Sequence, residues 1–157
     1  MIRKAAVEDL SSAAELAALL WPEAGKEELE QEFRDLLEDG GCALFLASEG
    51  DRDIGFAQCQ LRHDYVEGTA SSPVGYLEGI YVREDFRRKG TARLLLRRCE
   101  DWAARLGCRE FASDCELENG ESMAFHLKNG FREANRIICF TKPLEQPREN
   151  KASGDLA

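Results

Sequence analysis

A cluster of basic residues lies between positions 83 and 98 of this 157-residue chain. Within it, the segment RRKGTA, residues 87–92, stands where an apolar strand pattern ends and an amphipathic helix pattern begins. The first backbone N–H groups of a helix lack internal partners and the helix dipole is positive there, so such a junction binds phosphate. Gly90 would let the backbone approach the anion closely. The alternative is a solvated basic helix start, in which Arg97 and Asp101 are spaced for an i,i+4 pair.

Acidic and aromatic side chains elsewhere could bind a cationic ligand through charge and ring stacking. Glu78 is a lone carboxylate in an apolar strand pattern and needs a partner or a purpose there. Asp114 ends a strand, where capping the next turn is the alternative role. Tyr65 lies in a polar loop, where packing explains a ring poorly, whereas Trp21 ends an amphipathic helix and has an ordinary explanation as core. Glu116 is a further candidate.

The charge outside the basic cluster is strongly negative. The chain has 30 acidic and 21 basic residues, and outside residues 83–98 there remain 28 acids and 14 bases. Such a field repels nucleic acid and favours cationic partners. The alternative is that the acidic charge only keeps the protein soluble.

The elements that must position these residues are predicted from periodicity and breakers. A short strand near the start leads into a helix through residue 21, and a second helix covers 26–39 and ends at Gly40. Two strands, 42–50 and 53–66, form a hairpin, and a third strand covers 73–82. A long helix starts near Gly90 and stops at Gly107. A strand at 108–114, a helix at 119–129 and a last strand pair at 131–143 follow.

The order β α α β β β α β α β β predicts a mixed α/β fold with a central sheet flanked by helices. We expect one domain over residues 1–143 and a polar, disordered tail over 144–157. No apolar run approaches the roughly 20 residues of a membrane span, and the N-terminus lacks a secretory signal, so we expect a cytoplasmic protein without membrane contact. The six cysteines form no CxxC pair, which predicts no metal site or disulfides and mostly buried thiols.

The pattern Arg87-x-x-Gly90-x-Ala92 after the strand YLEGIYV resembles the signature of the GCN5-related N-acetyltransferases (GNAT). The segment NGESMAFHLKNGF resembles a later motif of that family, and the predicted element order is also the family's. The resemblance implies that acetyl-CoA is bound, with its pyrophosphate in the loop and its pantetheine arm along the main chain of the preceding strand. The cofactor-binding residues so implied are Ile80, Tyr81, Val82, Arg87, Arg88, Lys89, Gly90, Thr91, Ala92 and Asn119.

Within the family, the segments LWP, RHDYVEGTASSPVGYLEGIYV, GCREFASDCELEN and GFREANRIICFTK resemble the bacterial aminoglycoside 6'-N-acetyltransferases over residues 1–142. That resemblance implies antibiotic resistance and substrate contacts by Trp21, Tyr65, Glu78 and Asp114. Related enzymes sometimes carry an acid where this chain has Asn135, so one charge contact to the amine is lost here. The acidic character of the chain suits a substrate with several ammonium groups.

Direct attack of the 6'-amine on the thioester is the expected mechanism. Glu78 is the first candidate for accepting the amine's proton, and Asp114 is the second. Many family members place a tyrosine four residues before the Gly-Phe pair, where this chain has His126, so His126, Tyr65 and solvent are all open as the acid that protonates the thiolate. Cys115 is the one cysteine considered as a nucleophile, but no histidine follows it at a spacing that identifies a base.

Two other functions fit the same residues. One is acetylation of another cationic amine, such as a polyamine or a protein N-terminus, and the other is a non-catalytic acyl-CoA-binding module. The resemblance also implies a homodimer, which fits an exposed final strand pair.

Overall fold

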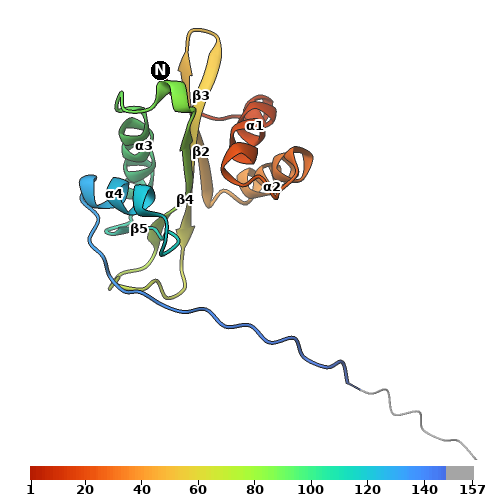
Figure 1. Ribbon diagram of the computed structural model, residues 1–157, viewed down its shortest axis with the longest axis vertical. Coiled ribbons are helices and arrows are strands. Elements are labelled where there is room, and N and C mark those ends of the chain that lie inside the picture. Colours follow the sequence, from red (N-terminus) through yellow and green to blue (C-terminus); the bar gives the residue numbers. More distant parts are fainter. Residues whose placement is uncertain (148–157) are drawn as a thin grey trace, which may run out of the picture.

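The computed structural model describes residues 1–147, which form one five-stranded sheet covered by helices on both faces (Figure 1). The strands lie in the order of the chain, and neighbours are antiparallel except for β4 and β5, which are parallel. Their bounds are β1 (Ile2–Lys4), β2 (Cys42–Glu49), β3 (Arg52–Arg62), β4 (Val74–Val82) and β5 (Phe111–Ala112). The predicted mixed α/β class is confirmed.

Helices cover both faces of the sheet in Figure 1. On one side are α1 (Leu10–Leu20), which follows a 3-10 turn, and α2 (Lys26–Asp39); on the other are α3 (Thr91–Arg105) and α4 (Gly120–Lys128). Gly40 ends α2 in a left-handed conformation, as the pattern predicted. No helix within residues 1–147 is both long enough and apolar enough to cross a membrane.

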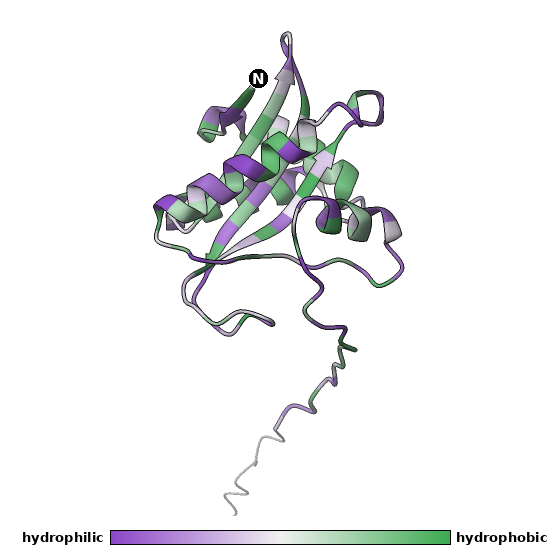
Figure 2. Cartoon of the chain, turned by 90° about the vertical axis from the view of Figure 1, so that its left-hand side faces the viewer, coloured by the Kyte–Doolittle hydropathy of each residue, from purple (hydrophilic) through white to green (hydrophobic). Residues whose placement is uncertain are grey.

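The sheet separates two apolar clusters. On the α1 side, Phe33 and Phe56 are fully buried together with leucines and alanines of α1. On the α3 side, Leu95 and Cys99 pack against inward residues of β2, β3 and β4. Figure 2 looks onto the α3 side and shows hydrophilic segments on the helix that covers the sheet there. The sheet is therefore buried on both faces, as a layered α/β fold requires.

The cysteines divide evenly by burial, so the expectation of mostly buried thiols was only half right. The buried ones are Cys42, Cys59 and Cys99, whereas Cys108 and Cys115 are half-buried and Cys139 is exposed. All six are free thiols.

The strand β4 carries a β-bulge at Glu78. Gln58 of β3 pairs with Gly79 and Cys59 pairs with Leu77, so Glu78 is an extra residue without an opposite partner on β3. Leu77 packs in the α3-side cluster, whereas a side chain at Gly79 would meet Trp21 and Leu20 of the α1 side. Regular alternation would place residues 77 and 79 on the same face, so the bulge switches the faces of β4 at this point.

The predicted strand pair at residues 131–143 was wrong within the described chain. Residues 131–147 contain no strand and run away from the sheet at the blue end of the ribbon in Figure 1. Ile137, Ile138 and Phe140 are 71%, 80% and 88% exposed. A strand forms only when a neighbouring strand exchanges hydrogen bonds with it, and this apolar segment has no such neighbour within residues 1–147. Of the predicted tail, residues 148–157 lie outside the described residues, and residues 144–147 are exposed.

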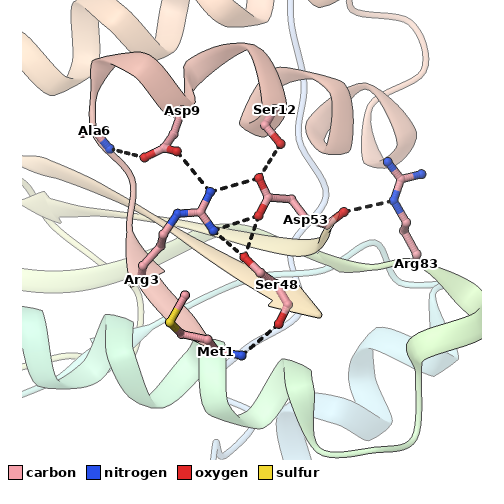
Figure 3. A network of polar contacts seen from close by, with 8 residues as sticks. All are labelled: Met1, Arg3, Ala6, Asp9, Ser12, Ser48, Asp53 and Arg83. Atoms are coloured by element: carbon pink, nitrogen blue, oxygen red, sulfur yellow. Dashed lines mark hydrogen bonds and ion pairs between the residues drawn. The ribbon is translucent and has the colours of Figure 1, made fainter. Parts of the chain in front are cut away.

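A polar network ties the first strand to the hairpin of β2 and β3 (Figure 3). Arg3 donates to both carboxylate oxygens of Asp53 at 2.8 and 3.0 Å, and Ser12 and Ser48 donate to the same carboxylate at 2.6 and 2.7 Å. The backbone oxygen of Asp53 accepts from Nε of Arg83 at 3.3 Å. Asp53 therefore joins β1, α1 and β2 to the residue that follows β4.

Replacing Asp53 by Asn should destabilise the fold in a pH-dependent way. Hydrogen bonds from Arg3, Ser12 and Ser48 lower the pKa of Asp53 from 3.8 to about 2. A carboxyl with a lowered pKa stabilises the fold above its unfolded pKa, and that contribution disappears as pH falls through the folded pKa. We expect Asp53→Asn to lose about 2 kcal/mol of unfolding free energy at pH 7, and the difference from wild type to shrink between about pH 4 and pH 2.

Urea denaturation at pH 7 and near pH 2.5 measures both effects. The control is Asp51→Asn in the exposed turn beside it, which should leave the midpoint unchanged. Equal midpoints for wild type and Asp53→Asn at pH 7 would contradict the role of the network.

Candidate active site

The strands β4 and β5 form a fork. They pair only at Gly75 with Phe111 and at Tyr76 with Ala112, and within residues 1–147 no strand pairs with β4 on that side beyond this point. The backbone N–H of Arg83 donates to Ile54 on β3, so by alternation the main chain of Tyr81 also faces β3. The main-chain groups of Ile80 and Val82 therefore point into the fork, and those of Tyr81, predicted to bind the cofactor, do not.

The glycine loop lies at the open end of the fork, between Val82 and the first turn of α3. Arg88 and Gly90 have positive φ angles of 60° and 83°, and Gly90 caps α3 through its carbonyl, which accepts from Leu94 at 3.1 Å. A side chain at Gly90 would meet nothing within 4 Å, so conformation and not space favours glycine there. The first N–H groups of α3, including those of Thr91 and Ala92, are thus presented as an anion site.

The basic side chains around this loop have different roles. Arg87 folds back on β4, where its Nε donates to the Val82 carbonyl at 2.7 Å and its guanidinium lies 5.3 Å from the Tyr81 ring. Arg88 and Lys89 are exposed. Further along, a cavity of about 420 Å³ between α3 and α4 is lined by Arg93, Leu96, Arg97, Glu100, Lys128, Asn129 and Gly130. The basic surface therefore continues from the loop along α3.

A cluster of two carboxylates, a guanidinium and a phenol lies beside the closed end of the fork. Arg62 donates to both oxygens of Glu78 at 2.9 and 3.2 Å, and its guanidinium lies 3.5 Å from the centroid of the Tyr76 ring. The Tyr76 hydroxyl donates to Asp114. Burial and the Asp114 carboxylate raise the pKa of Tyr76 above its usual range, so the phenol keeps the proton it donates.

The position of the Arg62 guanidinium in this cluster indicates which kind of ligand the cluster can bind. A planar cation is held between a carboxylate and the face of a ring, the combination that binds ammonium and guanidinium groups. Glu78 is 21% exposed and Asp114 is exposed, so both remain within reach of a ligand. The cluster is a preformed cation site at the point where β4 and β5 separate.

Trp21 forms the next part of this surface. Its ring stacks edge-on against Phe56 at 6.0 Å and is half-buried. A Cβ at Gly79 would lie 2.6 Å from the Trp21 ring, so glycine at position 79 makes room for the indole beside Glu78. Trp21 therefore serves the core, as its helix pattern suggested, and also lies next to the acidic cluster.

Tyr65 and Asn135 meet in a second group. Tyr65, 80% exposed on the loop between β3 and β4, donates to Glu67 at 2.9 Å. The Asn135 amide donates to the other oxygen of Glu67 at 3.2 Å. The structure thus brings Tyr65 and Asn135 together through an acid that sequence reasoning had not singled out.

His126 and Asn119 hold α4 beside the fork. Oδ1 of Asn119 accepts from the backbone N–H of Ser122 at 3.0 Å, which caps the helix and leaves the amide NH₂ as the group that could donate to a ligand. His126 lies 2.9 Å from the hydroxyl of Ser113, which follows β5. Cys115 is half-buried and Glu116 exposed just beyond. Within the described chain, no three His, Cys, Asp or Glu side chains gather as a metal site would require.

Besides Glu67, the site residues missed by sequence reasoning are Arg62, Tyr76 and Ser113. Tyr76 stands two residues before Glu78 on one strand, and Ser113 directly precedes Asp114, so proximity to a chosen acid was the available signal. Arg62 gives no such signal, because its pairing with Glu78 depends on the register of β3 against β4.

Gly79→Ala should displace Trp21 and destabilise the protein. The added methyl group would overlap a rigid ring and also lie 3.1 Å from Leu20. We expect a loss of about 1–3 kcal/mol in unfolding free energy, together with a changed near-UV circular dichroism signal from the indole. Gly41→Ala is the matched control, because its Cβ meets only Asp39 at 3.7 Å. Unchanged stability and spectrum in Gly79→Ala would show that Trp21 does not depend on this glycine.

Comparison with known proteins relates this geometry to one family. The model of the Acetyltransferase (GNAT) family matches residues 10–131. The chain is 43% identical over 145 residues to an aminoglycoside N(6')-acetyltransferase type 1 of Stenotrophomonas maltophilia, covering 92% of this chain and 94% of the relative. It is 38% identical over 144 residues to a protein of the same name from Acinetobacter haemolyticus, covering 92% and 99%.

Solved structures agree with these relatives. AAC(6')-Iy in complex with the bisubstrate analogue CoA-S-monomethyl-acetylneamine matches with a TM-score of 0.88 and 37% identity over 92% of this chain and 98% of that one. The aminoglycoside 6'-N-acetyltransferase AAC(6')-IG from Acinetobacter haemolyticus matches with a TM-score of 0.87 and 37% identity over 92% and 99%. With its fold, its glycine loop and nearly all of its length matched in this way, the chain belongs to the GNAT family of acetyltransferases.

Proposed function

We propose that this protein transfers the acetyl group of acetyl-CoA to the 6'-amine of aminoglycoside antibiotics. The observation that carries the proposal is the cation site of Glu78, Tyr76 and Asp114 at the closed end of the β4–β5 fork. It stands beside a phosphate-binding loop in a chain whose relatives are named aminoglycoside 6'-N-acetyltransferases. An anion site and a cation site at the two ends of one fork fit a phosphorylated donor and an ammonium-bearing acceptor.

Acetyl-CoA fits the fork from the loop inward. The N–H groups at the start of α3 would hold the pyrophosphate, and Lys89 and Arg88 would add positive charge around it. The main chain of Ile80 and Val82 would hold the pantetheine arm, with the amide of Asn119 on its other side. The basic cavity lined by Arg93, Arg97 and Lys128 is the next surface a phosphate on the nucleoside could reach.

The catalytic roles follow from this placement. Glu78 accepts a proton from the bound ammonium, directly or through a water, and Asp114 orients the amine with Tyr76 behind it. The backbone N–H of Ile80 points into the fork and can donate to the oxyanion of the tetrahedral intermediate. Arg62 pairs with the Glu78 carboxylate in the free protein, and the ammonium group of the substrate pairs with the same carboxylate when it binds. Trp21, Tyr65 and Asn135 line the approach of the sugar rings.

Glu78→Gln should lower kcat for kanamycin or tobramycin by a factor of ten or more, because the amide cannot accept the proton. The dissociation constant of CoA, measured by calorimetry, should stay the same. The control is Glu49→Gln at the exposed end of β2, which should change neither value. A non-catalytic acyl-CoA-binding module would show CoA binding without turnover in the wild-type protein.

The substrate is tested by thiol release from acetyl-CoA with aminoglycosides, spermidine and a peptide as acceptors. Release with kanamycin and tobramycin supports the proposal. No release with either, beside release with spermidine or the peptide, would sink the aminoglycoside assignment and leave an acetyltransferase for another amine.

We further propose that the protein works in the cytoplasm, where acetyl-CoA is available, and that acetylation there protects the cell from the antibiotic.

We also propose a homodimer in which residues 137–143 of each chain pair with the sheet of the other. The support is the exposure of Ile137, Ile138 and Phe140, because apolar side chains gathered on an extended segment usually mark an interface. The acidic charge gives no reason to expect nucleic acid as a partner.

Replacing Ile138 and Phe140 by Asp should convert the dimer to a monomer, because each carboxylate would have to be buried in the interface. Light scattering should give twice 17.6 kDa for wild type and 17.6 kDa for the double variant. Val7→Asp, which alters another exposed apolar residue, should remain dimeric. A wild-type mass of one chain would contradict the dimer.

A further inference from the structure

Ser113 and His126 form a hydrogen-bonded pair at the apex of the fork. Ser113 is the first residue after the last ladder pair between β4 and β5. Its hydroxyl lies 2.9 Å from Nε2 of His126 and donates to the carbonyl of Leu77 on β4 at 3.2 Å. The pair therefore bridges α4, the end of β5 and β4 where the two strands separate.

The surroundings fix the proton positions on His126. Nδ1 lies 2.7 Å from the carbonyl oxygen of Ser122, which can only accept, and 3.4 Å from the hydroxyl of the same residue. The shorter contact favours a proton on Nδ1 in both charge states of the ring. Nε2 is the nitrogen that gains and loses a proton. In the imidazolium, Nε2–H donates to Ser113 and the serine proton points away toward Leu77; in the neutral ring, Ser113 donates to Nε2.

Packing holds the ring in this orientation. His126 stands edge-on to Phe125 at 5.6 Å and to Phe131 at 5.0 Å between centroids. The side chain is half-buried, so water can still return a proton to it. An oriented, rechargeable ring joined to a hydroxyl is the arrangement of a proton donor.

The position of the pair relative to the loop indicates what would receive the proton. If the pyrophosphate of acetyl-CoA lies at Gly90, its pantetheine arm can follow Val82 and Ile80 into the fork. The thioester at the end of that arm then lies near the apex, the closed end of the fork. Ser113 stands at that apex, and the carboxylate of Asp114 follows it in the chain. The Ser113 hydroxyl is 2.9 Å from Nε2 of His126, so the imidazole can supply a proton to a hydroxyl that stands at this end of the fork.

We propose that Ser113 donates its hydroxyl proton to the departing sulfur of CoA and is reprotonated by His126, an inference that rests on the acetyl transfer proposed above. As the carbon–sulfur bond of the tetrahedral intermediate breaks, its electron pair stays on sulfur, which takes the Ser113 proton. Ser113 takes the proton of Nε2, and His126 becomes neutral with its proton on Nδ1. Water returns one proton to His126. The nitrogen loses one proton to Glu78 before it attacks and a second to water as the amide forms, so each turnover releases one proton to solvent.

The test combines turnover with a binding measurement that needs no turnover. For Ser113→Ala we expect kcat to fall by a factor of about 10–100 while KM for the aminoglycoside changes less than about threefold. Wild type should bind CoA about threefold to tenfold more tightly than desulfo-CoA, as one hydrogen bond to the sulfur provides, and Ser113→Ala should bind the two equally.

Two further variants separate the roles. Ser113→Thr keeps the hydroxyl and should recover most of kcat. His126→Gln cannot recharge the serine, so kcat should fall while the preference for CoA over desulfo-CoA remains. Ser11→Ala on the exposed side of α1 is the control, and thermal melting confirms that each variant is folded.

Failure of this inference and failure of the proposed function give different results. Wild-type acetylation of kanamycin together with an unchanged kcat and an unchanged CoA preference in Ser113→Ala would overturn the role of Ser113. If wild type acetylates no amine at all, the proposed function fails, and an equal affinity of wild type for CoA and desulfo-CoA would then overturn the contact with sulfur as well.

Discussion

The early separation of β5 from β4 is the constraint on which the rest of the site depends. Two ladder pairs hold the strands together, and beyond them the edge of β4 keeps main-chain groups that no strand satisfies within the described chain. Such groups need a partner, and an extended ligand lying between the strands would supply it. The same opening aligns the glycine loop at one end with Ser113, Asp114 and Glu78 at the other. A single topological feature thus sets the length and direction of the cofactor path.

Charge is distributed along that path so that two ligands of opposite sign can meet. The basic start of α3 lies at the open end, and the carboxylates of Glu78 and Asp114 lie at the closed end. Arg62 and Tyr76 keep those carboxylates paired in the free protein, which lowers the cost of holding two acids close together. The net charge of −9 is therefore the sum of a basic surface along α3 and a more strongly acidic remainder.

The sequence could predict the features that depend on neighbouring residues, such as helices and their ends. It could not predict the contacts that depend on how one strand pairs with another. Helical periodicity and glycine stops located α2 and α3, and Gly90 was predicted to lie at the start of a helix that binds an anion, because both properties are local. Glu78 was recognised because a carboxylate in an apolar strand is anomalous. Its partner Arg62 is sixteen residues away and meets it only through the pairing of β3 with β4. The strand pair at 131–143 failed for the same reason: alternation predicts an extended segment but does not say which strand will pair with it.

The most direct measurement of the central claim is a crystal structure with CoA and kanamycin bound together. We expect the CoA sulfur near Ser113 at the apex of the fork, the pyrophosphate at the N–H groups that begin α3, and the 6'-amine of kanamycin within hydrogen-bonding distance of Glu78. CoA bound outside the fork, or a 6'-amine that contacts neither Glu78 nor Asp114, would contradict it.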